Sequence, residues 1–199
     1  MAYKILRAEI CVPLVVKNGE LFNLFGVGKF ILSLNRGWVV IIIRKYVSRD
    51  YEALVSLMEQ LQDYLVGIDQ LQRLRRQEQY GKSYTDKVLT KIEKEQGIIF
   101  LVKESDKAIG VIVGVIEIQT AQNLLECIPT KTGRIIDLYV DKEYRSRGIG
   151  ILLMNKLESY FLKQKCTIIK VEVFVPNSAR LFYENYGFHD RTVDMIKVL

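Results

Sequence analysis

Two arginines and two glycines stand close together in the segment Arg145–Gly150, which reads Arg-Ser-Arg-Gly-Ile-Gly. Glycine lets a backbone approach a ligand closely, and the first N–H groups of a helix point at whatever lies at its N-terminus. Arg145 and Arg147 add positive charge at the same place. These residue types at this spacing predict a binding site for an anion.

The elements around this segment would position it between a strand and a helix. The run from Ile135 to Val140 is apolar, β-branched and aromatic, which predicts a buried strand. Beyond the turn, apolar residues recur at the spacing of one helix face: Leu153, Leu157, Tyr160 and Phe161. The segment therefore reads as strand, basic glycine turn and helix.

The spacing fits neither of two common phosphate-binding motifs. Leu153 stands where a dinucleotide-binding G-x-G-x-x-G motif has its third glycine, and the G-x-x-x-x-G-K-[ST] pattern is not matched. A strand and helix packed tightly on glycine would be the purely structural alternative.

A second pattern begins 27 residues after Gly150 (177 − 150), in a predicted short helix that follows a strand. It combines Asn177, Ala179, Tyr183 and a final Gly187-Phe188. Ala179 and Tyr183 are four residues apart, so both would lie on one face of that helix.

Together the two segments resemble the GNAT N-acetyltransferase superfamily. Arg145–Gly150 is similar to its acyl-CoA signature [QR]-x-x-G-x-[GA], and the stretch from Asn177 is similar to its N-x-A-x-x-x-Y-x-x-x-G-F pattern. The resemblance covers about residues 39–199. Lys142 stands where a proline often follows the family's strand, which is a small departure at a turn.

The resemblance implies acetyl-CoA as co-substrate, and it implies a set of binding residues. The backbone of the central strand would hold the pantetheine arm and the carbonyl, and Asn177 would brace that arm. The strand residues are Leu138, Tyr139 and Val140. The pyrophosphate would bind the amides of Arg145, Ser146, Arg147, Gly148, Ile149 and Gly150.

The resemblance places Tyr183 opposite the sulfur that leaves as a thiol. A phenol of pKa about 10 is a weaker acid than a thiol of about 8.5, so full proton transfer is uphill by roughly 2 kcal/mol. Tyr183 would therefore stabilise the developing thiolate mainly by hydrogen bonding. A packed aromatic ring without chemistry is the alternative, which Phe182 and Tyr186 fit better.

Acetyl transfer also requires a base, because an alkyl ammonium of pKa near 10.4 is no nucleophile. Asp137 interrupts an apolar strand, where an unpaired carboxylate is costly, so it is either satisfied or functional. Glu117, near the end of a neighbouring strand, is a second candidate. Diamine acetyltransferases of the superfamily carry two successive acids here, whereas this chain has Ile136-Asp137.

The remaining reactive residue types predict little chemistry. His189 is expected to be exposed, and Cys127 and Cys166 lack a neighbouring base, which favours direct transfer over an acyl-cysteine. With one histidine and three scattered cysteines, we expect no metal site, no disulfide framework and reduced thiols of a cytoplasmic protein.

The composition is that of an ordinary soluble globular protein, with 26% charged and 49% hydrophobic residues. The net charge of +6 favours an acidic ligand, and a phosphate-rich co-substrate accounts for it without nucleic acid. The apolar stretch 21–43 is interrupted by Lys29 and Arg36, so we expect no membrane span. The sequence is compatible with a homodimer and does not decide the oligomeric state.

The chain divides at residue 38 into an N-terminal extension (1–38) of unclear role, dispensable for catalysis, and a GNAT domain (39–199). Val12–Val16 could be a short strand within the extension. The expected order of the domain is strand, two helices, three strands, helix, strand, helix and a last strand at Val193–Leu199. This predicts a mixed α/β fold with one mostly antiparallel sheet and helices on both faces.

Three functions are compatible with these observations. The first is acetylation of a small primary amine by direct attack in a ternary complex. The second is acetylation of a protein N-terminus or lysine, and the third is a non-catalytic CoA-binding module, because fold does not fix function.

Overall fold

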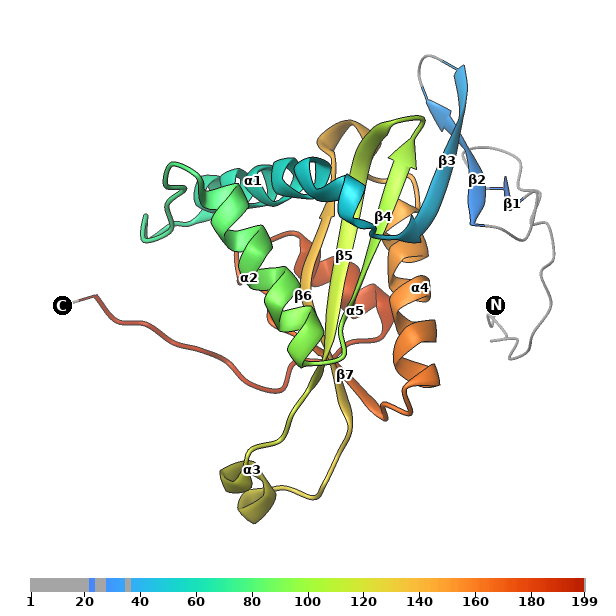
Figure 1. The fold of residues 1–199 in the computed structure, drawn as a ribbon. Coiled ribbons are helices and arrows are strands. Elements are labelled where there is room, and N and C mark those ends of the chain that lie inside the picture. Colours follow the sequence, from blue (N-terminus) through green and yellow to red (C-terminus); the bar gives the residue numbers. More distant parts are fainter. Residues whose placement is uncertain (1–21, 24–27, 35–36, 199) are drawn as a thin grey trace, which may run out of the picture.

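The computed structural model describes residues 22–23, 28–34 and 37–198. Seven strands form one sheet in the order β1 to β7; α1 and α2 cover one face, and α4 and α5 lie on the other (Figure 1). The strands are β1 (Phe22–Asn23), β2 (Lys29–Leu34), β3 (Gly37–Lys45), β4 (Ile98–Glu104), β5 (Lys107–Glu117), β6 (Thr132–Val140) and β7 (Ile168–Val171). The α-helices are α1 (Tyr51–Ile68), α2 (Tyr80–Lys94), α3 (Ala121–Glu126), α4 (Ile149–Lys163) and α5 (Ala179–Tyr186), and short 3₁₀ turns span Ser48–Asp50 and Lys142–Tyr144.

Neighbouring strands are antiparallel throughout, except for the parallel pair β6 and β7. Parallel neighbours need a crossover connection, and α4 provides it. The predicted fold class, a mixed and mostly antiparallel sheet with helices on both faces, is confirmed.

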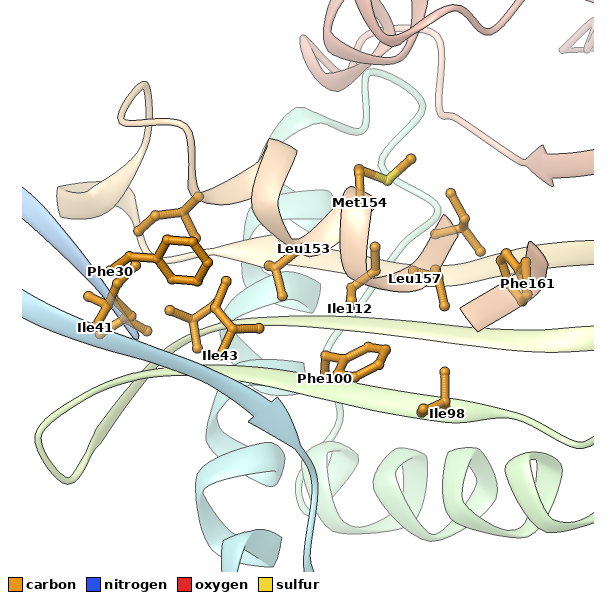
Figure 2. Close-up of a cluster of buried hydrophobic side chains, with 14 of the residues drawn as sticks. Phe30, Ile41, Ile43, Ile98, Phe100, Ile112, Leu153, Met154, Leu157 and Phe161 are labelled. Atoms are coloured by element: carbon orange, nitrogen blue, oxygen red, sulfur yellow. The ribbon is translucent and has the colours of Figure 1, made fainter. Parts of the chain in front are cut away.

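The main core lies between the sheet and α4 (Figure 2). Leu157 and Phe161 of α4 pack directly on the backbone of β5 and β6. A Cβ atom on Gly114 would lie 2.5 Å from a Leu157 methyl, and one on Gly133 would lie 2.6 Å from the Phe161 ring. The helix that follows the glycine turn is therefore fixed on the sheet at close range.

The opposite layer holds α1 and α2 against the sheet through a second cluster that includes Leu54, Met58 and Val88. An ion pair fixes the start of α1. Arg44 of β3 donates to the Asp50 carboxylate at 2.6 Å, and that side chain is only 2% exposed. Burying an isolated charge is costly, and the Arg44 guanidinium offsets this cost for the buried Asp50 carboxylate.

A β-bulge interrupts β6 before its end. Ile135 pairs with Gly114 and Asp137 with Val113, so Ile136 is an extra residue without an opposite partner. On the other side, the pairing of β6 with β7 also ends at Ile135. From Ile136 onward, no strand among the described residues pairs with the β7-facing edge of β6.

The structure departs from the sequence prediction in the loops and at the last strand. The segment 120–133, where the expected order of elements has no helix, contains α3, which projects away from the layers (Figure 1). The strand predicted at Val193–Leu199 is wrong for its described residues, because 193–198 are irregular and Met195 is 87% exposed. Alternating apolar residues favour a strand, but a strand also requires a neighbour to pair with, and this segment has none among the described residues.

The predicted N-terminal extension (1–38) is described only in part. Val12–Val16 lies outside the described residues. Within 1–38, β2 pairs along its length with β3, and the Phe30 side chain is buried in the main core. The division at residue 38 stays a prediction. Across the described part of the chain, no helix is long and apolar enough to cross a membrane.

Candidate active site

The basic glycine turn leads from β6 into α4 through backbone of unusual conformation. Ser146 and Gly148 both have positive φ, +59° and +78°, and Gly148 is the N-cap residue directly before α4. When right-handed and left-handed backbone conformations alternate along a turn, successive N–H groups point into one concavity that can bind an anion. The first-turn amides of α4 add to it, because they have no acceptor within the helix.

The turn lies where the sheet opens. It follows the carboxyl end of β6, on the edge that β7 leaves unpaired after Ile135. The first turn of α4 also approaches α5, since a Cβ atom on Gly150 would lie 3.3 Å from the Phe182 ring. Because Gly150 has no side chain, α5 can pack closely on the first turn of α4.

Arg145 is held against the end of β6. Its Nε donates to the carbonyl of Val140 at 2.9 Å, and its guanidinium lies over the rings of Tyr64 and Tyr139, 4.7 and 5.5 Å from their centroids. Two aromatic faces and a carbonyl stabilise the cation at this position. The positive charge predicted at the turn is therefore fixed beside the open edge of β6.

Asn177, just before α5, is oriented by two donors. Its Oδ1 accepts from the Tyr64 hydroxyl at 3.2 Å and from the amide of Ala179 at 2.9 Å. With the oxygen occupied in this way, the Nδ2 group faces the other direction and is left to donate. Tyr64 thus joins α1, the glycine turn and the start of α5.

Asp137 is buried on the side of β6 that faces α2, with 8% of its surface exposed. The hydroxyl of Tyr84 donates to its two carboxylate oxygens, at 3.0 and 3.1 Å. Burial raises the pKa of Asp137 to about 6, because desolvation penalises the charged form, and the Tyr84 hydrogen bond partly opposes this rise. A carboxylate of this pKa exchanges its proton near neutral pH, as a general base requires.

Tyr183 of α5 is also buried, with its ring edge-on to Phe182 and Phe188 at centroid distances of 5.3 and 5.5 Å. Burial first, and then the charge of Asp137, raise the pKa of Tyr183 well above its usual range. Its hydroxyl therefore stays protonated. The charge of Asp137 also raises the pKa of Tyr84, so this one carboxylate acts on tyrosines of α2 and α5, which lie on opposite faces of the sheet.

Glu117, the other predicted base, is not brought to this place. It pairs with Thr132 at the opposite end of β6, about 16 Å from Asp137 at roughly 3.3 Å per residue. Its carboxylate forms ion pairs with Lys170 at 2.7 Å and Arg134 at 3.9 Å. These contacts account for Glu117 as a surface charge.

Leu138 and Val140 direct their side chains toward the α4 core, whereas Tyr139 packs on the α1 side. Backbone N–H and C=O groups of successive residues point to alternate sides of an antiparallel strand. Because the N–H of Asp141 donates to Ile109 of β5, Tyr139 also faces β5, whereas Leu138 and Val140 face the edge that β7 leaves open.

Sequence reasoning missed the tyrosines of α1 and α2. Tyr64 and Tyr84 lie in the two helices that the sequence predicts after the first strand of the domain, and the rings of Tyr80 and Tyr84 stack with centroids 5.3 Å apart. A signal was present, because Tyr80, Tyr84 and Val88 recur every four residues and so share one helix face. His189 and Cys127 are exposed and Cys166 is buried with a free thiol. No cluster of three or more metal-ligating side chains occurs within the described ranges.

The comparison with protein families agrees with this geometry. The family model described as Acetyltransferase (GNAT) family matches residues 55–188, which is more than half of the chain. The chain belongs to the GNAT acetyltransferase family. The matched range runs from α1 to the end of α5 and so contains the turn, Asp137, Asn177 and Tyr183.

Among curated proteins, the chain is 46% identical over 61 residues to the uncharacterized N-acetyltransferase MJ1530 of Methanocaldococcus jannaschii. The match spans 30% of this chain and 39% of that protein, well under two thirds of its length. Among solved structures, the F44R mutant of BH1408 from Bacillus halodurans has a TM-score of 0.68 at 23% identity, covering 79% of this chain and 99% of that one. AAC(6′)-Iy, in complex with the bisubstrate analogue CoA-S-monomethyl-acetylneamine, has a TM-score of 0.58 at 14% identity, covering 80% and 99%. At these identities, the solved structures show a shared fold.

Proposed function

We propose that this GNAT protein transfers the acetyl group of acetyl-CoA to the primary amine of a small molecule, by direct attack in a ternary complex. One observation carries the proposal: the anion-binding turn follows the same unpaired end of β6 that bears the buried Asp137, whose charge also raises the pKa of the buried Tyr183. One end of that edge suits a pyrophosphate, and the other presents a base and a hydroxyl donor.

The residues of the turn fit coenzyme A. The amides of Gly148, Ile149 and Gly150 would take the pyrophosphate, with Arg145 and Arg147 supplying charge, and Ser146 shaping the turn. Backbone groups of Leu138 and the N–H of Val140 would hydrogen-bond the pantetheine arm along the open edge, and the Nδ2 of Asn177 would donate to one of its carbonyls. Acetyl-CoA supplies the activated acyl group.

Asp137 would accept a proton from the acceptor's ammonium group, which makes the nitrogen a nucleophile. The nitrogen forms the new C–N bond with the thioester carbon, and the C–S bond breaks. Tyr183 would donate a hydrogen bond to the departing sulfur, which ends as a thiol carrying one of the two protons lost by the ammonium; the other is released to solvent. Because Asp137 is buried, the acceptor amine has to reach into the protein to meet it, which suits a small molecule.

Thiol release from acetyl-CoA tests the function. The wild-type chain would be assayed with polyamines, amino acids, aminoglycosides and peptides, and Asp137→Asn and Tyr183→Phe would serve as matched controls. We expect at least one small amine to release thiol in the wild type, and both variants to be slower. Release with peptides alone would favour a protein substrate, and no release with any amine would leave a CoA-binding module.

A further inference from the structure

Tyr84 of α2 makes the only side-chain hydrogen bonds to Asp137 among the described residues, and no ion pair reaches that carboxylate in the same part of the chain. Buried carboxylates elsewhere in the fold are compensated differently. Asp50 has Arg44, and Asp69 accepts from three backbone amides. Asp137 thus depends on a single neutral hydroxyl.

The charge of Asp137 acts on three tyrosines of the helices that pack against the sheet. Tyr80 and Tyr84 come from α2 and Tyr183 from α5, and each has its pKa raised by the charge of Asp137 as well as by burial. None of them carries a positive charge. Whatever holds the charged form of Asp137 in place must therefore act by hydrogen bonding, which Tyr84 alone does here.

The geometry of Tyr84 is that of a fixed support. One O–H shared between both oxygens defines the plane of the carboxylate and leaves the outward lone pairs to accept from another donor. The Tyr84 ring is itself fixed, because Tyr80 stacks on it with an interplanar angle of 10°. Reactive groups need such support to keep their productive orientation.

We propose that Tyr84 is a positioning residue for acetyl transfer: its hydroxyl orients the Asp137 carboxylate and stabilises its charged form, so that Asp137 takes the proton of the acceptor's ammonium group. This inference rests on the proposed function and extends it to α2, which carries neither of the two sequence motifs. Tyr84 acts through Asp137 and touches no reacting atom.

The test is Tyr84→Phe, which removes the hydroxyl and keeps the ring and its stacking on Tyr80. Carboxyl ¹³C NMR would follow the titration of Asp137, with Asp137→Asn to assign the resonance. A hydrogen bond to a charged group corresponds to about one pKa unit or more, so we expect the pKa of Asp137 to rise by that amount. Tyr51→Phe is the matched control, because its hydroxyl donates to the exposed Asp86 at the same helix pair.

A second readout separates positioning from mere structural support. With the amine that is active in the thiol-release screen, the acidic limb of the kcat/KM profile should move to higher pH in Tyr84→Phe. For a pKa that rises by about one unit, the rate at pH 5 should fall about tenfold and the rate at pH 7 about twofold. An unchanged Asp137 titration, or lower stability with an unmoved limb, would overturn the proposal. A wild type without turnover would instead refute the proposed function, and the NMR titration would still decide whether Tyr84 stabilises the charge.

Discussion

Replacing Asp137 by asparagine should make the protein more stable at alkaline pH while it abolishes the proton-accepting group. The pKa of Asp137 is raised in the folded state, from 3.8 to about 6, because burial disfavours its charge. Between these two values the unfolded chain binds fewer protons than the folded one, so wild-type stability falls as pH rises. Asparagine has no charge to bury, and its oxygen can still accept from Tyr84.

The size of the effect follows from linkage. A difference of about 2.2 pKa units corresponds to about 3 kcal/mol once the pH is well above 6, and to only about 1 kcal/mol at pH 4.5. The free energy of unfolding of Asp137→Asn, minus that of the wild type, should therefore grow by about 2 kcal/mol between pH 4.5 and pH 8. Comparing the two pH values removes any effect of the asparagine amide on the free energy of unfolding that does not depend on pH.

Urea denaturation of both proteins at pH 4.5, 6 and 8 measures this difference. Asp50→Asn is the matched control of opposite sign. Hydrogen bonding to Arg44 lowers the pKa of Asp50, so its contribution is present above pH 3.8 and is lost as pH falls through the folded-state pKa. That variant should lose stability at pH 8. If the free energies of unfolding of Asp137→Asn and the wild type instead differ by the same amount at all three pH values, burial does not disfavour the charge of Asp137.

Three other expectations concern the cofactor site and the domain boundary. Tyr183→Phe should lower turnover by about 10²–10⁴-fold with acetyl-CoA affinity nearly unchanged, as steady-state kinetics and calorimetry would show; a wild-type rate would remove its hydroxyl from the mechanism. Gly148→Val should abolish CoA binding, because valine is strained at φ +78° and crowds the turn, whereas Arg147→Ala should only weaken it; normal calorimetric affinity in folded Gly148→Val would contradict the assignment. Deletion of residues 1–38 should preserve CoA affinity and lower the melting temperature, since the packing of Phe30 is lost; a folded fragment unable to bind CoA would contradict the boundary.

Much of the fold could be predicted because its signals are local. The apolar run before Arg145, the glycines after it and the helical spacing of Leu153 and Leu157 each report on a few neighbouring residues, and the strand, turn and helix follow from them. The predicted strand at 193–198 failed for the complementary reason. Its pattern is local, but pairing depends on a neighbour that the pattern does not specify.

The site was only partly predictable, since its residues meet through tertiary packing. Asp137 stood out as a charge inside an apolar strand, but the sequence does not tell that Tyr84, 53 residues earlier, supplies its hydrogen bond. Glu117 was equally plausible by strand order, and only the register of β5 against β6 places it at the opposite end. Tyr64 could not be linked to Asn177 without knowing how α1 crosses the sheet.

The extra residue in β6, Ile136, determines how the strand alternates between the two faces of the sheet. Ile135 faces the α4 layer, and Asp137 faces α2; without Ile136 between them, the two would still alternate regularly. Removing Ile136 would therefore keep the remaining alternation and abolish the bulge, at the loss of one side chain that packs on the α1–α2 cluster. The unpaired edge of β6 begins at this same residue. A deletion at 136 thus tests whether the number of residues in β6 keeps that edge open, whereas substitutions at Ile136 leave the number unchanged.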